Sequence, residues 1–122
     1  MTWSSTGAFL LAMAVVLGAF GAHGLKDRLD AYSLGVWEKA VFYHFIHALG
    51  LLIAALLPKT GTIPQSAAQW VCGLLLAGIL IFSGSLYVLA VSGNRMLGAI
   101  TPVGGVSFIA AWLLLSWFLM RR

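Results

Sequence analysis

The chain has 122 residues, of which 61% are hydrophobic and 8% are charged, and its formal net charge is +4. An ordinary soluble domain is roughly 45–50% apolar and about 25% charged, so this composition excludes a soluble globular domain and a disordered chain. The charged side chains leave charge-free runs at 1–25, 40–58, 60–94 and 96–120. Since a membrane-spanning helix needs about 20 mainly apolar residues, the sequence indicates an integral membrane protein.

Four spans are predicted, at about 4–24, 36–57, 68–91 and 97–119. No Lys or Arg precedes the apolar part of the first span, so it is interpreted as an uncleaved span and not as a signal peptide. The mixed charges at 26–30 predict a turn or a short interfacial helix after it. Ser33 is the predicted N-cap of the second helix, which would hold Glu38 near the positive end of the helix dipole.

Two connections are marked by turn-forming residues. Two prolines and a glycine at 58–64 predict a loop, and Ser92-Gly93-Asn94-Arg95 predicts a tight turn that makes the last two helices an antiparallel hairpin. The loop at 58–67 and both termini then share one side of the membrane. With three basic residues on that side against four on the other, the positive-inside rule selects no orientation. Trp3, Trp70 and Trp117 fall near the first side and predict an aromatic belt.

The basic residues and the cysteine indicate what the protein does not bind. The seven basic residues are scattered over the predicted loops and ends, without the cluster that nucleic acid would require. Lys and Arg beside membrane spans bind anionic headgroups instead. Cys72 is the single cysteine, so an intramolecular disulfide is excluded, and its surroundings hold no zinc-site spacing. We therefore expect no nucleic-acid partner, no metal and no cofactor.

Small residues recur at helical spacing in three of the spans. In lipid, where little hydrophobic force drives helices together, close backbone approach through small residues supplies much of the association. Five glycines are predicted as helix-packing positions: Gly18, Gly73, Gly84, Gly98 and Gly105. Packing within the chain is the favoured interpretation, and the interface of a homo-oligomer is the alternative.

The second helix carries an unusual polar stripe. At 100° per residue, Lys39, Tyr43 and His47 fall on one arc of its surface. Such a stripe on a spanning helix faces the bundle interior, a water-filled cavity or a partner subunit. His23, at the end of the first span, is expected level with the start of this helix and within reach of Glu38, Lys39 or Tyr43.

Three interpretations of the polar stripe compete. In the favoured one, His47 hydrogen-bonds a backbone carbonyl or Ser83 and the role is structural. In the second, His23, Tyr43 and His47 form a proton or small-solute relay in an oligomer. In the third, His44 and His47 with His23 bind a metal or haem, although no cysteine or carboxylate completes a ligand shell on that face. No activated serine, carboxylate pair or glycine-rich phosphate loop is present, so an enzyme is not expected.

Several stretches are long enough to indicate a family. They are Gly18–Leu25, Trp37–Ala40 with Tyr43 and His47–Leu49, Phe82–Tyr87, and Leu97–Gly105. In this order, over nearly the whole chain, they resemble the YgdD-type family of small bacterial inner-membrane proteins, grouped under a domain of unknown function. The resemblance implies a four-helix inner-membrane protein and no established activity. His44 departs from the family's pattern, which weakens a two-histidine metal site and leaves His23 and His47 as the better pair.

The matching motifs also place polar residues on both halves of the bundle. We predict that hydroxyls of the segments at 83–85 and 101–102 meet the imidazole of His47 across a glycine-lined seam. The candidate polar centre consists of His23, Glu38, Lys39, Tyr43, His47, Ser83, Ser85 and Thr101.

The sequence as a whole predicts an all-α, integral membrane four-helix bundle that forms one domain over 1–122. The expected function is non-enzymatic and lies in packing with itself, with lipid or with a membrane-protein partner. The alternative is an oligomeric conduit or binding site for a proton, metal ion or small solute on the face of His23, Tyr43 and His47.

Overall fold

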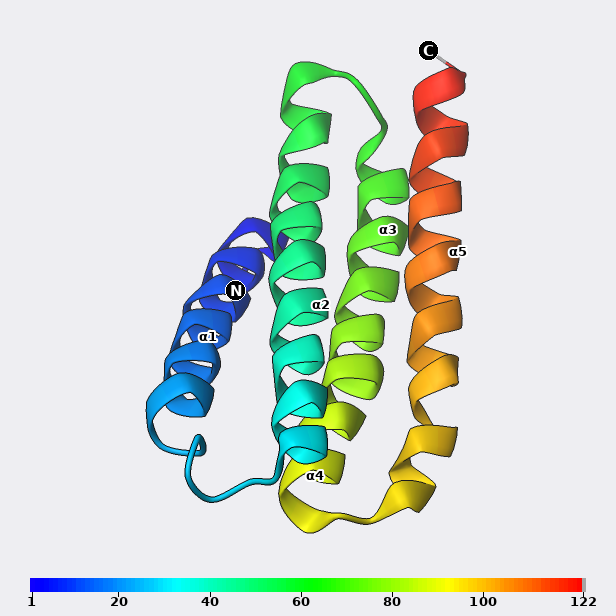
Figure 1. Cartoon of the computed structure of the whole chain (residues 1–122). Coiled ribbons are helices and arrows are strands. Elements are labelled where there is room, and N and C mark those ends of the chain that lie inside the picture. The colour runs from blue at the N-terminus through cyan, green and yellow to red at the C-terminus, as the bar shows by residue number, and fades with distance from the viewer. Residues whose placement is uncertain (122) are drawn as a thin grey trace.

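The computed structural model describes residues 1–121, which form four long helical segments packed together (Figure 1). Each segment is long and apolar enough to cross a membrane: Trp3–His23, Ala31–Thr60, Gln65–Ser92 and Arg95–Met120. The elements in chain order are α1 (Trp3–His23), α2 (Ala31–Leu56), the 3-10 helix η1 (Leu57–Thr60), α3 (Gln65–Gly78), the π-helix η2 (Ile79–Ser83), α4 (Gly84–Ser92), the 3-10 helix η3 (Arg95–Ala99) and α5 (Thr101–Met120). The predicted all-α fold with four spans is confirmed.

The second helix begins five residues earlier than predicted, at Ala31 instead of residue 36. Its N-cap is Asp30, whose carboxylate accepts a 2.7 Å hydrogen bond from the backbone N–H of Ser33. The prediction of Ser33 as the N-cap is therefore wrong, because Asp caps as well as Ser and lies one turn earlier. Glu38 consequently sits about two turns into the helix, beyond the first turn where the dipole acts.

The last two spans form the predicted antiparallel hairpin. Gly93 adopts a left-handed backbone conformation, φ 72°, and its N–H bonds the carbonyl of Leu89 to close the end of α4. Asn94 then caps η3 by accepting a hydrogen bond from the N–H of Met96. The third span is interrupted by the π-helix η2, which joins α3 to α4. A π-turn closes over i→i+5 and so changes which residues share a face on either side of it.

The helices are laid out with α1 at one edge and α5 at the other (Figure 1). α1 packs chiefly on α2, while α2 also contacts α3, η2 and α4. α5 packs on α3 and η2. This layout leaves the outer faces of α1 and α5 uncovered, with apolar side chains such as Val15 and Leu113 exposed. Those faces are suited to the hydrocarbon of a bilayer.

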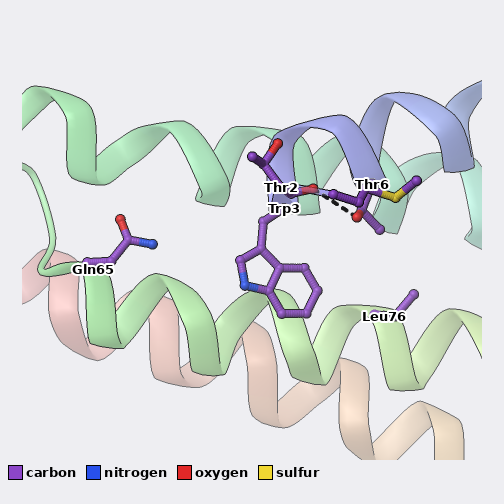
Figure 2. Close-up of a pocket in the computed structure, with 6 residues that line it drawn as sticks. Thr2, Trp3, Thr6, Gln65 and Leu76 are labelled. Atoms are coloured by element: carbon purple, nitrogen blue, oxygen red, sulfur yellow. Dashed lines mark hydrogen bonds between the residues drawn. The ribbon is translucent and has the colours of Figure 1, made fainter.

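The largest buried cluster lies between α2, α3 and α5. Leu51, Val71 and Leu75 have no exposed surface, and Phe108 of α5 packs against them. Trp3 of α1 also packs against this cluster. Figure 2 shows its indole pointing from α1 toward α3, beside a surface depression of about 460 Å³. Trp3 thus differs from Trp70 and Trp117, which are exposed as a belt would require.

The glycines that bring helices together are mostly not the predicted ones. Of the five, Gly18 and Gly105 have a neighbour across an interface, Val41 and Phe82 respectively. The remaining three, Gly73, Gly84 and Gly98, have nothing within 4 Å of the position of an added Cβ. The tight approaches are made instead by Gly7, Gly21, Gly50, Gly78 and Gly104. Spacing reveals that small residues share a face, but it does not tell which face meets a neighbour.

Candidate functional site

Tyr43 and His47 of α2 lie within an aromatic cluster at the centre of the bundle. The ring of His47 is stacked on Phe108 of α5, with centroids 3.5 Å apart and planes 12° apart. The ring of Tyr43 lies 4.5 Å from that of Phe82 in η2. Trp112 covers the other end of the cluster, 5.9 Å from His47. Two members of the predicted stripe therefore face apolar rings of neighbouring helices.

The hydrogen bond of His47 is made within its own helix. Its Nδ1 lies 2.7 Å from the carbonyl oxygen of Tyr43, one turn earlier. Because a carbonyl can only accept, Nδ1 carries the proton and donates. The partner is a backbone carbonyl, but one of the same helix and not of a neighbouring helix, and among residues 1–121 no hydrogen bond joins His47 to Ser83. His47 is nearly buried, with 6% of its surface exposed.

The predicted hydroxyls join helices through hydrogen bonds to groups other than His47. Ser83, fully buried, donates to the carbonyl of Ala40 on α2 over 2.8 Å. The hydroxyls of Ser85 on α4 and Thr101 on α5 lie 2.6 Å apart. Ser107, which the sequence did not single out, donates to the carbonyl of Leu74 over 2.7 Å. These bonds satisfy polar groups at depths where a bilayer offers no water.

His44 is a buried polar residue that the sequence reasoning set aside. Its Nδ1 lies 2.8 Å from the hydroxyl of Tyr87, which joins α2 to α4. Its Nε2 is buried and has no hydrogen-bond partner among residues 1–121. The signal that would have found the pair is Tyr87 itself, because a phenol on a spanning helix needs a polar partner. Because His44 departs from the family's pattern, the sequence favoured His23 and His47 instead.

The remaining predicted site residues, His23, Glu38 and Lys39, are exposed near one end of the bundle. Gly21 packs against Trp37, so His23 lies level with the start of α2. His47 lies ten residues beyond Trp37, about 15 Å along the helix axis at 1.5 Å per residue. The structure therefore does not bring His23 together with Tyr43 or His47. Among residues 1–121 no group of three or more His, Cys, Asp or Glu side chains is placed to hold a metal ion.

The same end of the bundle carries a small set of charged contacts. Hydrogen bonds from the backbone and side chain of Ser33 lower the pKa of Asp30 below its ordinary value, and the charge of Arg95 adds to this. The guanidinium of Arg95 lies over the ring of Tyr32, 4.6 Å from its centroid. The α4–α5 turn and the start of α2 are thus held near one another.

Known proteins match this chain along most of its length. A family model described as "Protein of unknown function (DUF423)" matches residues 17–105. The UPF0382 membrane protein SSP2132 of Staphylococcus saprophyticus is 52% identical over 109 residues, which cover 89% of this chain and 88% of the relative. The chain belongs to this family. The UPF0382 membrane protein YwdK of Bacillus subtilis is 48% identical over 111 residues, which cover 89% of this chain and 88% of YwdK. No solved structure matches the chain.

Membership of the DUF423/UPF0382 family confirms the resemblance found in the sequence and the bacterial membrane location. The names of these relatives identify membrane proteins and no reaction. In this DUF423 protein, hydrogen bonds of His44 and Ser83 tie α2 to α4 and η2, and the bond between Ser85 and Thr101 ties α4 to α5. The rings of Tyr43 and His47 pack between α2, η2 and α5. This arrangement fixes the relative positions of the helices.

Proposed function

We propose that this protein is non-enzymatic and acts through contacts that its membrane-embedded surface makes with a second copy, with lipid or with a partner membrane protein. The observation that supports the proposal is that polar side chains in the interior form hydrogen bonds between helices. Trp37, Ser83 and Ser107 each donate to a carbonyl of another helix. Groups bonded in this way are engaged in holding the fold together.

The outer surface supports the same proposal. The exposed faces of α1 and α5 are apolar, so they are available to lipid or to other membrane helices. Gly73 on α3 and Gly84 on α4 have open space beside them, and glycines at such positions allow a second helix to approach closely. One form of the proposed contact is a homo-oligomer in which two copies pack through the face of α3 and α4.

The alternative function, an oligomeric conduit or binding site on His23, Tyr43 and His47, receives less support. It needs the three side chains to share one path, but His23 lies at the end of α1 and is exposed. Tyr43 and His47 lie in the middle of α2, between aromatic rings of other helices. A binding site formed by Tyr43 and His47 alone is the version of this alternative function that an experiment must exclude.

Native mass spectrometry of the gently extracted protein tests the proposal. Wild type, His47→Ala and the more conservative His47→Gln are compared for oligomeric state, bound small molecules and stability. We expect the same species in all three, with no ion or small solute bound, and the lowest stability for His47→Ala. A bound ion or solute that wild type retains and both variants lose would overturn the proposal in favour of the binding site.

A further inference from the structure

A groove of about 400 Å³ opens between α2, α4 and the start of α5. It lies at the end of the bundle that carries the α4–α5 turn (Figure 1). Its apolar wall is formed by Val36, Phe82, Leu86, Leu89 and Pro102. Its remaining lining residues are Tyr32, Lys39, Gly98 and Thr101. The groove therefore combines a largely apolar wall with a cation.

The groove lies where a lipid would meet the protein. Lys39 and Lys59 bound a charge-free run at 40–58, whose 19 residues span about 28 Å as a helix, close to the ~30 Å hydrocarbon core. Lys39 thus marks one boundary of that core. Phe82 contacts Tyr43, eleven residues along α2 from Tyr32, so the lining runs for about 16 Å along the helix. Seven of these eleven residues lie on the headgroup side of Lys39, so the lining runs from the headgroup region to about 6 Å inside the hydrocarbon core.

The mouth of the groove carries two cations. Lys39 is exposed, and no carboxylate among residues 1–121 lies within 4.0 Å of a Lys or Arg nitrogen. Arg95 is held over the ring of Tyr32, another lining residue. The carboxylate of Asp30 accepts a hydrogen bond from the backbone N–H of Ser33 and also interacts with the charge of Arg95, so Lys39 is the cation of the mouth without a nearby acidic partner within 4.0 Å in the described part of the chain. A lysine at this depth extends toward the headgroups, where lipid phosphates lie.

We propose that this groove binds one anionic phospholipid, with its phosphate near Lys39 and Arg95 and the start of an acyl chain along the wall of Leu86 and Phe82. The charge of the headgroup complements the mouth, and the acyl chain complements the wall. A soluble phosphate would use the cations alone and leave the apolar wall without an occupant. The inference rests on the proposed function, which it deepens by naming lipid of a stated charge as one of the contacts.

Lipid titration followed by native mass spectrometry tests the inference. The delipidated protein is titrated with phosphatidylglycerol and, separately, with phosphatidylcholine. We expect wild type to bind phosphatidylglycerol more tightly than phosphatidylcholine. In Lys39→Gln the ratio of these two affinities should fall about fivefold, as expected for the loss of one lysine near an anionic headgroup. Lys59→Gln is the matched control, because it removes the same charge from the opposite boundary, and it should retain the wild-type preference.

A second variant blocks the groove without changing its charge. Gly98 lines the groove and has nothing within 4 Å of the position of an added Cβ, so Gly98→Leu adds an apolar side chain at the groove without a clash at its Cβ. We expect this variant to bind phosphatidylglycerol more weakly although Lys39 and Arg95 are intact. Equal lipid preference in wild type, Lys39→Gln and Gly98→Leu would overturn the inference. That result would not affect the proposed non-enzymatic function. The proposed function is tested separately, and a solute that both His47 variants lose would overturn it.

Discussion

The backbone nitrogen of Phe82 in η2 lies directly against Gly104 of α5, so close that a Cβ at Gly104 would overlap it. The two helices approach here through the backbone of Gly104 and the backbone and Cβ of Phe82. Because backbone atoms cannot turn aside as a flexible side chain can, the contact sets the spacing of α5 from η2. It also places Phe108, one turn further along α5, against His47.

Gly104→Ala should therefore destabilise the protein, since a methyl group at this contact forces the helices apart. Overpacking of this kind costs about 1–3 kcal/mol. Gly35→Ala is the matched control on α2: its added methyl meets nothing within 4 Å, and Ala favours a helix over Gly by roughly 0.5–1 kcal/mol. The melting temperature in detergent should fall for the first variant and rise slightly for the second. Equal melting temperatures for the two would contradict the packing described here.

Tyr87→Phe should destabilise the protein by removing the partner of His44. The loss leaves Nδ1 of a buried imidazole without its hydrogen bond, which we expect to cost about 1 kcal/mol. Tyr43→Phe is the control, because the Tyr43 hydroxyl makes no side-chain hydrogen bond within the described part of the chain. Reversible unfolding by denaturing detergent compares the two. If Tyr43→Phe lost as much stability as Tyr87→Phe, the His44–Tyr87 bond would not be the cause.

Trp37→Phe should loosen α1 from α2. The indole N–H of Trp37 donates to the carbonyl of Leu17 over 2.9 Å, and its ring packs against Gly21. α1 packs mainly on α2, so few other contacts hold α1 in place when this hydrogen bond is lost. Hydrogen exchange should rise in the second half of α1 and stay unchanged in α5. Trp70→Phe, which alters an exposed indole, should leave α1 as protected as in wild type.

The start of α2 should depend on the ionised form of Asp30. Its pKa is lowered in the folded protein from an ordinary value of 3.8, so the cap contributes stability above that value and loses it as the pH falls through the lower, folded-state pKa. We expect Asp30→Ala to speed hydrogen exchange at the amide of Ser33 at neutral pH. Asp27→Ala removes the same charge outside the helix and should leave that amide protected. Faster exchange in both variants would show that charge, and not capping, protects this turn.

Much of the architecture follows from composition and local sequence. A low density of charges separated by long apolar runs requires helices that satisfy their own backbone in lipid. Gly93 and Asn94 mark the hairpin turn because glycine adopts the left-handed conformation without steric cost and asparagine caps the next turn. These local rules act within a few residues, so they do not need the rest of the fold.

Contacts between helices were decided only by the tertiary structure. The first and last spans are apolar on all sides, so no hydrophobic stripe reveals which face is covered, and Gly104 proved a contact where Gly98 did not. The π-turn at Ile79–Ser83 changes the register of the third span and directs Ser83 to Ala40 instead of His47. The pairing of His44 with Tyr87 likewise joins residues 43 positions apart. In a membrane, where hydrophobicity does not select one helix face over another, steric fit and hydrogen-bond satisfaction make that choice, and both depend on the neighbouring helix.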